Sequence, residues 1–520
     1  MNVAFDPWIP VVDLHGKYRR ISPLQVFTEG DKYSDFAVRP HERVALMRLI
    51  ICIAHACING PENKSDWEKI PEKLPKMAER YLTEWKDSFE VFHPNKPWLQ
   101  IPDIKPVKGD GWISVSKLAF FMASGNNSTL FDHDGMYELR HVEICDTLVS
   151  MLAFQCFSPG GTISKVHWLG EPTKDKSEDA PCVSSSMLHT LIRRSDLSKT
   201  LQANIPTYSR VRRLMGMHMV DPIGRPVWEQ MPKSLQDEAT ILNATRTYLG
   251  RLTPLKRLIL LNGKDNAKTM IFGDGLYYPS FRKDNFPPES TATVIRKINK
   301  KKETRELLAY STDKGTWRDL PAILAKLTGE SSGIGSPLAI DFLQENEDAN
   351  CDLIVSGVAR NKAKVIYTSE SVYLVPSSWR LPGGLDSFEH EISRAEDLAA
   401  NLRRAVEIYR KAIDPGWEKR LEEDRKARNK LFATPMTYFW TSAEANLKLL
   451  INCFKKFGTD EFVPKIREWR LLLFSAAEES YEITCGQETS RQLKAFIKGW
   501  EVLHRRAKTS DNENQTQESL

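Results

Sequence analysis

The residues that could carry acid–base, nucleophilic or phosphate chemistry do not form a known catalytic pattern. The sequence contains no H-E-x-x-H, no G-x-S-x-G and no G-x-x-x-x-G-K-[ST] motif. Residues 158–162, SPGGT, are rich in glycine but lack the lysine and the spacing of a nucleotide-binding P-loop. The acidic pair Glu422-Glu423 lies amid Arg420 and Arg425, which is typical of a solvated helix face. The residues therefore predict no enzymatic activity.

Metal ligands do not occur at the usual spacings either. His133 and His141 are eight residues apart, with no paired cysteines beside them. The eight cysteines include no C-x-x-C pair, whereas a structural zinc site usually needs thiolates paired at short spacing. We expect no cofactor and no metal, and we expect reduced cysteines that are mostly buried. The cysteines are Cys52, Cys57, Cys145, Cys156, Cys182, Cys351, Cys453 and Cys485.

Basic residues form short clusters in the middle of the chain. Phosphate contacts need such clusters, because each lysine or arginine that neutralises a phosphate releases counterions. The overall charge does not decide the matter, since 73 lysines and arginines against 68 acids leave a net charge of only +5. Lysine-rich hairpins are also common on solvated surfaces, so both interpretations stay open. The clusters are Arg193-Arg194, Arg210–Arg213, Lys256-Arg257, Arg296-Lys297 and Lys300–Lys302.

A polar loop with an aromatic ring follows an apolar segment. Residues 124–129 read SGNNST, which favours a solvent-facing turn, because glycine and asparagine tolerate left-handed backbone and the hydroxyls bond locally. Phe131, Asp132 and His133 come almost directly after it. The pattern predicts a loop with these residues at its tip, and it leaves open what the aromatic ring contacts.

The first part of the chain mixes helical and β-prone segments. Helices are expected over Arg43–Ile58, Leu139–Phe157 and Met187–Leu201, where apolar residues recur along one face. Thr269–Val375 contains short β-prone runs between turn signals. The run Asp6–Val12 holds two prolines, so it suits an edge strand or an extended arm rather than a central strand.

The pattern of apolar residues in the sequence changes after Pro382-Gly383-Gly384, where they begin to recur with a period of 3.6. Short connections between four or five helices favour an antiparallel bundle over residues 385–506. The tail, residues 507–520, is polar and is expected to be disordered. The preceding region, residues 1–384, is expected to be one large mixed α/β domain. The helices are expected near 393–413, 415–431, 436–457, 461–483 and 488–506.

Membrane insertion and secretion are not expected. No run of about 18 apolar residues occurs, which is the length that a membrane span needs. The first residues, MNVAFDPWIPV, do not have a basic segment followed by an apolar one, as a signal peptide would. We therefore expect a cytoplasmic protein with no membrane partner.

Several stretches, in one order along the chain, are similar to one known family. They are MNVAFDPWIPV, ERVALMRL, FHPNKPWLQ, SGNNSTLFDH, SPGG, IGRPVWE and YLGRLTPLKR. Together they resemble CasA, the large subunit of the type I-E CRISPR surveillance complex Cascade, over the whole chain except its tail. The resemblance implies an α+β fold, in which a large mixed α/β N-terminal domain is followed by a C-terminal four-helix bundle.

The function that the resemblance implies is antiviral defence by binding rather than by catalysis. The family's large subunit recognises a protospacer-adjacent motif (PAM) in double-stranded DNA, helps open the duplex for R-loop formation by the guide RNA, and helps recruit the nuclease. The implied partners are therefore CRISPR guide RNA, PAM-bearing target DNA, the backbone, handle-binding and small Cascade subunits, and a helicase–nuclease or HNH-type effector nuclease.

The resemblance also implies RNA-contacting residues. In the family the polar loop reaches the 5′ handle of the guide RNA and the neighbouring backbone subunit. A phenylalanine ring on such a loop can stack on an unpaired base, which contributes about 1–3 kcal/mol. Phe131 can also be a core anchor for the loop. The implied residues are Asn126, Asn127, Phe131, Asp132 and His133.

Three segments are implied to contact DNA. A glycine loop matches Gly160 and Gly161, since glycine lets the backbone approach DNA closely, although the same residues suit an ordinary helix end. A minor-groove lysine matches Lys268, with Lys264 as the alternative. A hairpin that wedges between base pairs matches residues 355–364, and the residues implied at its tip are Asn361 and Lys362.

Two departures from the family concern the wedge and a zinc site. Lys362 stands where a glutamine is familiar in the wedge, so the PAM read by this chain does not follow from the resemblance. Some relatives carry a four-cysteine zinc site, but only Cys145 lies near one of its halves, so no zinc is expected.

Two other functions stay open. A large subunit of another class 1 CRISPR effector would share the architecture but not the polar loop. A stand-alone metal-dependent nuclease belongs to a different class, and its activity with divalent metal would separate it from the other two.

Overall fold

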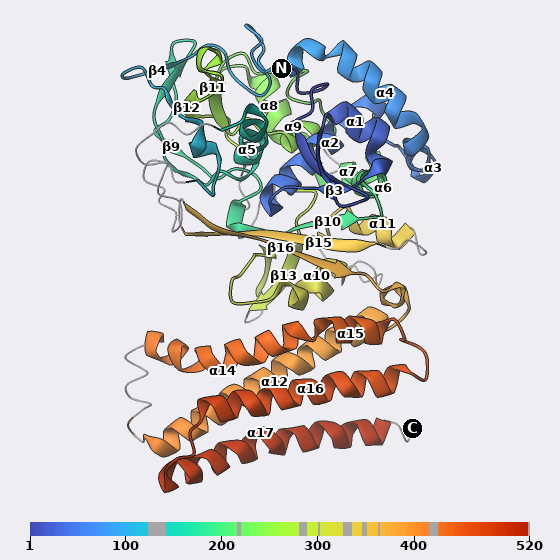
Figure 1. Cartoon of the computed structure of the whole chain (residues 1–520), viewed down its shortest axis with the longest axis vertical. Coiled ribbons are helices and arrows are strands. Elements are labelled where there is room, and N and C mark those ends of the chain that lie inside the picture. The colour runs from blue at the N-terminus through green and yellow to red at the C-terminus, as the bar shows by residue number, and fades with distance from the viewer. Residues whose placement is uncertain are drawn as a thin grey trace. The chain divides into compact units, whose positions relative to one another are not determined.

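The structure, a computed structural model, describes residues 1–122, 142–215, 220–279, 289–299, 302–325, 335–345, 351–361, 364–414, 416 and 425–517. The chain divides into an N-terminal unit (Met1–Thr316 with Ala322–Val375) and a C-terminal unit (Trp317–Pro321 with Pro376–Leu520). The first unit mixes helices and strands and the second is helical, so the expected α+β fold class is confirmed (Figure 1). The main boundary, after Val375, precedes the predicted one at Gly384.

The first sheet of the N-terminal unit has β1 (Ile9–Asp13) at its centre. β1 pairs antiparallel with β2 (Tyr18–Ile21) on one side and with β3 (Tyr33–Phe36) on the other. The expectation of an edge strand or extended arm is therefore wrong for this segment. Pro10 is tolerated because pairing with β3 begins only at Val11, and the Pro10 carbonyl accepts the N–H of Ala37.

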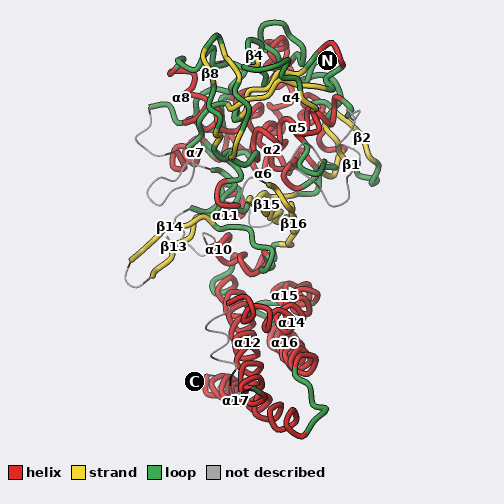
Figure 2. Tube along the Cα trace, turned by 90° about the vertical axis from the view of Figure 1, so that its left-hand side faces the viewer, coloured by secondary structure: helices red, strands yellow, loops and turns green. Residues whose placement is uncertain are grey.

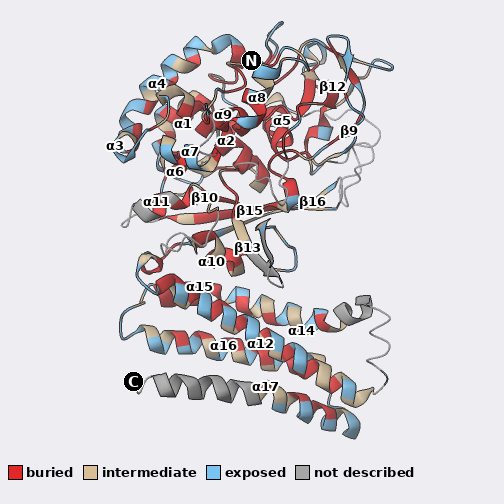
Figure 3. Cartoon of the chain, turned by 180° about the vertical axis from the view of Figure 1, so that it is seen from behind, coloured by how far each residue is buried: buried red, intermediate tan, exposed pale blue. Residues whose placement is uncertain are grey.

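A long buried helix, α2 (Pro40–Ile58), organises the interior of the N-terminal unit. Every side chain from His41 to His55 is buried, and Figure 3 shows α2 and α5 (Ile144–Phe157) among the most buried elements. α2 packs against α4 (Ile70–Glu84), α5 and α9 (Tyr248–Leu252). Most residues between Val44 and Ala54 are apolar around the whole helix, and such a helix is expected to lie in a core.

The segment predicted as a helix over Met187–Leu201 is instead a strand followed by a helix. β10 (His189–Arg193) pairs antiparallel with β15 (Asp352–Asn361), and α6 (Leu197–Asn204) begins after Asp196, whose carboxylate accepts the N–H of Lys199. The prediction fails because β10 is buried on both faces, so its apolar residues do not alternate with polar ones.

A long hairpin completes this sheet. β15 pairs antiparallel with β16 (Lys364–Leu374) in the strand order β10-β15-β16, and α2 packs against both hairpin strands. A β-bulge lies between Ala359 and Arg360, near the tip. Figure 2 shows a second hairpin, β13 (Val294–Asn299) with β14 (Lys302–Leu307), extending away from the helices of its unit. The β-prone run at Ala309 forms only a single bridge, with Met187.

A third sheet, in the order β11-β12-β5, stands beside a sheet in the order β4-β7-β8. β11 (Arg257–Leu261) and β12 (Thr269–Asp274) form a tight antiparallel pair in which Arg257 lies opposite Asp274. The remaining strands are β4 (Ile104–Pro106), β5 (Ile113–Ser114), β6 (Gly161–Thr162), β7 (Val166–Trp168), β8 (Glu171–Pro172) and β9 (Lys176–Ser177). The remaining helices of the unit are α1 (Pro23–Glu29), α3 (Lys64–Glu68), α7 (Tyr208–Met215), α8 (Glu238–Arg246) and α11 (Ile340–Glu345).

The C-terminal unit is a bundle of long helices around an aromatic and aliphatic core. α12 packs against α14, α16 and α17, and α14 and α15 also contact α16. Phe388, Phe439, Trp469 and Tyr481 are fully buried between them. The helices are α12 (Gly384–Ile413), α14 (Arg425–Ala445), α15 (Leu447–Phe454), α16 (Phe462–Thr484) and α17 (Ser490–Gln517). A short helix, α10 (Leu320–Leu324), begins in the segment that joins this unit.

The start of one bundle helix differs from the prediction. α12 begins at Gly384 rather than near residue 393, because Leu385, Phe388 and Ile392 already continue its buried face. α17 spans Ser490–Gln517, and the expected disorder of residues 507–520 stays a prediction.

Candidate nucleic-acid interface

The polar loop falls outside the described residues, so Asn126, Asn127, Phe131, Asp132 and His133 remain sequence-based predictions. The residues before it are firmly anchored, since the ring of Phe120 lies 5.3 Å from those of His41 and Phe154. After it, Arg20 donates to the carboxylates of Glu143, at 2.5 Å, and Asp146, at 2.9 Å.

The glycine loop begins where α5 ends. Ser158 caps that helix by donating its N–H to the carbonyl of Phe154, at 2.9 Å, and β6 then pairs Gly161 with Ser177 of β9. Gly161 is exposed, whereas Gly160 packs against the chain around residues 177–179. A Cβ on Gly160 would lie 2.7 Å from the carbonyl oxygen of Ser177. Gly160 is therefore needed for a backbone–backbone contact inside the protein, in addition to any role at DNA.

Two side chains fix the peptide group between Pro159 and Gly160. Arg257 donates from Nη2 to the carbonyl oxygen of Pro159, at 2.9 Å. On the other side of the same peptide group, the Gly160 N–H donates to Oδ1 of Asp179, at 2.8 Å. Because both polar atoms of one peptide group are held by side chains, the plane of that group is set from both directions.

The same oxygen of Asp179 also binds the end of the long hairpin. Arg360 donates from Nη1 to Asp179 Oδ1 at 2.5 Å, with the two side chains 21% and 23% exposed. Asn361 follows at the exposed end of β15 and pairs with Lys364, while Lys362 lies outside the described residues. The structure thus brings the predicted glycine loop and the predicted hairpin tip together through one carboxylate.

Lys268 lies at a different place. Its carbonyl accepts the N–H of Val115, at 3.1 Å, directly before β12. Asp274 lies beside Arg257, which binds the glycine loop. Asp274 comes six residues after Lys268, and six residues of a strand span about 20 Å. Lys264 is exposed in the turn that precedes Lys268. The structure therefore does not bring either lysine to the glycine loop.

Some of the predicted basic clusters contain side chains that are buried or paired with carboxylates of the protein itself. Lys256 and Arg257 are 2% and 3% exposed, and both face Asp274, at 3.6 and 3.7 Å. Burial lowers the pKa of Lys256 to about 8 and that of Arg257 to about 10. Phosphate binding by this pair is therefore contradicted. Arg193 is likewise engaged, since it donates to Asp352 at 2.7 Å.

Sequence reasoning did not find Asp179 or Arg360 as site residues, and it assigned Arg257 to the wrong partner. Asp179 follows Lys176-Ser177-Glu178 in a stretch that looks like an ordinary polar loop. The only sequence signal was the position of Arg360 directly before the implied tip residue Asn361. Their joint role depends on contacts between segments that are far apart in the sequence.

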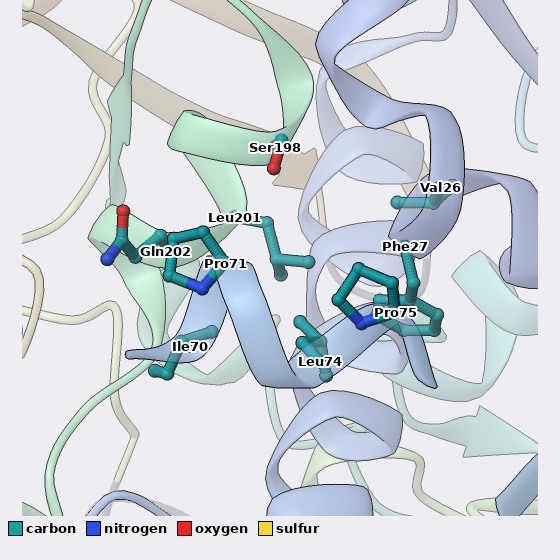
Figure 4. A pocket seen from close by; sticks show the side chains of 9 residues that line it. All are labelled: Val26, Phe27, Ile70, Pro71, Leu74, Pro75, Ser198, Leu201 and Gln202. Atoms are coloured by element: carbon teal, nitrogen blue, oxygen red, sulfur yellow. The ribbon is translucent and has the colours of Figure 1, made fainter. Parts of the chain in front are cut away.

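Other candidate sites are weak. A shallow pocket lies between α1, α4 and α6, and Figure 4 shows apolar side chains and the polar Ser198 and Gln202 around it. Its lining contains no titratable side chain that could fix a charged ligand. Within the described ranges, no three His, Cys, Asp or Glu side chains are grouped to hold a metal ion. None of the described helices has the length and apolar character that crossing a membrane requires.

The fold and the site define a large α+β protein in which a glycine loop is tied to the end of a long β-hairpin. Residues 2–480 match the family described as CRISPR-associated protein Cse1. The chain therefore belongs to this family, which confirms the resemblance to CasA, the large subunit of type I-E Cascade.

Individual relatives agree with this assignment. The CRISPR-associated protein CasA/Cse1 of Thermus thermophilus is 26% identical, over 96% of this chain and 95% of the relative. The crystal structure of Thermus thermophilus CasA has the same fold, with a TM-score of 0.75 at 21% identity over 97% of this chain and 98% of that one. A chain described as part of a CRISPR RNA-guided surveillance complex aligns with a TM-score of 0.68, at 18% identity over 97% and 99%.

Proposed function

We propose that the chain is the non-catalytic large subunit of a type I-E CRISPR surveillance complex. In that role it recognises the PAM in double-stranded DNA, helps open the duplex for R-loop formation by the guide RNA, and helps recruit the nuclease. The family membership supports the general role. The observation that carries the DNA-reading part is the link from Gly160 through Asp179 to Arg360, because it joins two segments that would both contact the duplex beside the PAM.

The two linked segments suit two tasks. The glycine loop offers exposed backbone at Gly161, and backbone can approach DNA closely where no Cβ intervenes. The hairpin presents Asn361 at the exposed end of β15, where it pairs with Lys364 of β16. A wedge between base pairs must offset an unstacking cost of a few kcal/mol per step, so it needs a rigid support. The sheet β10-β15-β16 and the buried helix α2 behind it supply that support.

The proposal assigns the polar loop to RNA and to assembly. Asn126, Asn127, Phe131, Asp132 and His133 would contact the guide RNA handle and the neighbouring backbone subunit. Lys268 would enter the minor groove at the PAM. Both assignments rest on the family resemblance, and the six-residue run from Lys268 to Asp274 covers about 20 Å along the strand. That distance corresponds to roughly six base pairs at 3.4 Å each.

The direct test is reconstitution with the other complex subunits and a guide RNA. We expect the chain to assemble with them, and the complex to bind a PAM-bearing duplex more tightly than the same duplex with the PAM scrambled. Equal binding of the two duplexes, at several salt concentrations, would overturn PAM recognition. Failure to assemble with guide RNA under conditions where the other subunits do so would overturn the subunit assignment.

The same preparation separates the alternatives. Assembly only with subunits of another class 1 effector would assign the chain to that effector. Cleavage of DNA by the isolated chain with divalent metal would identify a stand-alone nuclease. Recruitment is tested by adding the helicase–nuclease to the DNA-bound complex, where we expect cleavage that depends on this chain.

A further inference from the structure

Asp179 accepts two hydrogen bonds at a single carboxylate oxygen. One comes from the backbone N–H of Gly160, at 2.8 Å, and the other from the guanidinium of Arg360, at 2.5 Å. Both are charge-assisted, and such bonds are shorter and stronger than those between neutral groups. The Asp179 carboxylate is therefore the group through which the described hydrogen bonds connect the glycine loop to the end of the hairpin.

Apart from Asp179, the glycine loop and the hairpin are each held by separate contacts of their own. The glycine loop is fixed to the β11 end by Arg257, which donates to the carbonyl of Pro159 at 2.9 Å and to Ser177 Oγ at 2.5 Å. The hairpin is fixed to the sheet by the ladder between β10 and β15, which ends at Ser356. Beyond Ser356, β15 pairs only with β16 and reaches Arg360 past a bulge. The Asp179–Arg360 pair thus ties down the part of the hairpin that the sheet no longer holds.

We propose that Asp179 is a positioning residue for DNA reading, which fixes the glycine loop and the hairpin tip at one separation. The inference rests on the proposed function, because it assumes that both segments contact the duplex. A fixed separation lets the glycine loop and the hairpin tip engage one duplex at the same time. Without it, each segment still meets DNA, but the two no longer engage one duplex together.

The opposite end of the same hairpin supplies a matched control. Arg193 of β10 donates to Asp352 at the start of β15, at 2.7 Å, and these side chains are 34% and 27% exposed. The pair has the same chemistry and similar exposure, but Arg193 and Asp352 are direct partners in the strand ladder. If Asp179→Asn reduced DNA binding only by weakening the hairpin in general, Asp352→Asn should reduce DNA binding as well.

The first experiment measures coupling in the full chain without DNA. In Arg360→Ala we expect amide hydrogen exchange of residues 158–163 to rise by about tenfold, although the described hydrogen bond of Arg360 is to Asp179 and not to these residues. Asp179→Asn should raise the exchange of these amides to a similar extent, and Arg360→Lys should raise it less. Asp352→Asn should leave their exchange unchanged. Unchanged exchange in Arg360→Ala would show that Asp179 does not transmit the position of the hairpin, and the proposal would be wrong.

The second experiment measures DNA binding by the assembled complex. Asp179→Asn should weaken binding to a PAM-bearing duplex by about tenfold, and it should weaken binding to a duplex pre-opened beside the PAM by clearly less. Asp352→Asn should bind both substrates as the parent does. Parent-like binding by Asp179→Asn, or an equal loss in Asp352→Asn, would overturn the positioning role. If the parent complex itself does not distinguish PAM from scrambled duplex, the proposed function fails, while the exchange measurement still decides whether Asp179 couples the two segments.

Discussion

Arg48 and Glu289 form an ion pair inside the N-terminal unit, where their side chains are only 2% and 4% exposed. The guanidinium of Arg48 also donates to the carbonyl oxygens of Leu252, at 3.1 Å, and Arg251, at 2.5 Å. Burial raises the pKa of Glu289, but Arg48 and His189 more than offset this, so the pKa lies below its ordinary value of 4.5. The central helix α2 is thus joined to two later segments through one buried charge.

Removing one member of this pair should be costly. We expect Glu289→Gln to lower the free energy of unfolding by about 3–5 kcal/mol, because the Arg48 charge stays buried without its partner. Urea unfolding of the full chain measures this. The control is Asp146→Asn, which removes a carboxylate that is 51% exposed in its pair with Arg20 and should cost less than about 1 kcal/mol. Similar losses in the two variants would contradict the prediction.

Stability should fall at mildly acidic pH because of a buried histidine. Burial, with a smaller contribution from Arg39, lowers the pKa of His41 to about 3 from an ordinary value of 6.5. Between these values the unfolded chain takes up a proton that the folded protein does not, so the free energy of unfolding decreases as the pH falls. The decrease per pH unit is about 1.4 kcal/mol for one such group.

Replacing this imidazole should flatten the pH dependence. His41 lies between the rings of Phe120, at 5.3 Å, and Phe157, at 6.1 Å, so His41→Phe keeps an aromatic side chain there without a titrating group. Unfolding measured from pH 7 to pH 4 should show a smaller slope for this variant, by about one proton. The exposed His15, changed to glutamine, serves as the control and should leave the slope as it is. An unchanged slope in His41→Phe would show that another group dominates.

The glycine loop should not tolerate a methyl group at its first glycine. In Gly160→Ala the new Cβ would meet the backbone of residues 177–179, which cannot swing aside as a side chain could. We expect a loss of about 1–3 kcal/mol in unfolding free energy, together with weaker binding of PAM-bearing DNA. Thr162→Ala, at an exposed position in β6, is the matched control. Wild-type stability of Gly160→Ala would mean that the loop can move away at little cost.

Substitutions of Lys268 and Lys362 should impair different steps of DNA binding. Lys268→Ala should weaken recognition of a PAM-bearing duplex by about 1–3 kcal/mol and reduce discrimination against other duplexes. Lys362→Ala should hinder strand separation more than first binding, because a wedge acts when base pairs unstack. Binding to a full duplex and to one opened beside the PAM distinguishes the two, since pre-opening should rescue Lys362→Ala largely and Lys268→Ala only in part. If neither variant differs from the parent, the basic run Lys297–Lys302 becomes the next candidate.

The polar loop should matter for assembly. Phe131→Ala should weaken incorporation into the guide-bound complex by about 1–3 kcal/mol, the value for one lost base stack, and should leave the isolated chain folded. Titration of the remaining complex with the labelled chain measures incorporation, and thermal unfolding checks the fold. Phe121→Ala is a useful comparison, because that ring precedes the loop and lies 3.3 Å from the guanidinium of Arg39. Parent-like incorporation of Phe131→Ala would remove the loop from the interface.

Periodicity in the sequence was enough to predict the main elements of the fold. The central helix α2 and the long bundle helices follow from apolar residues at helical spacing, and β15 and β16 follow from β-prone runs. Prediction failed where burial removed the pattern, as in β10, whose residues His189 to Ile192 are buried on both faces whether polar or apolar. It also failed at β1, where Pro10 looked incompatible with a central strand but sits just before the pairing with β3 begins.

The candidate site was harder to predict, for a different reason. Gly160 and Asn361 could be placed from the resemblance, but Asp179 connects them through contacts between residues far apart in the sequence. Composition also cannot tell a buried cation from an exposed one. Lys256 and Arg257 look like a phosphate-binding pair, and only the structure shows that Asp274 faces both of them in the interior.

The bond of Arg360 to Asp179, just past the bulge between Ala359 and Arg360, separates an anchored part of the hairpin from a part that can vary. Beyond Arg360, the exposed Asn361 and Lys364 pair with each other at the end of the two strands. Substitutions at the exposed Asn361 and Lys364 should therefore change stability by no more than about 0.5 kcal/mol, as is usual for exposed positions. Evolution, or an engineer, could exchange the turn residues to retune which DNA is accepted while the scaffold beneath them stays the same.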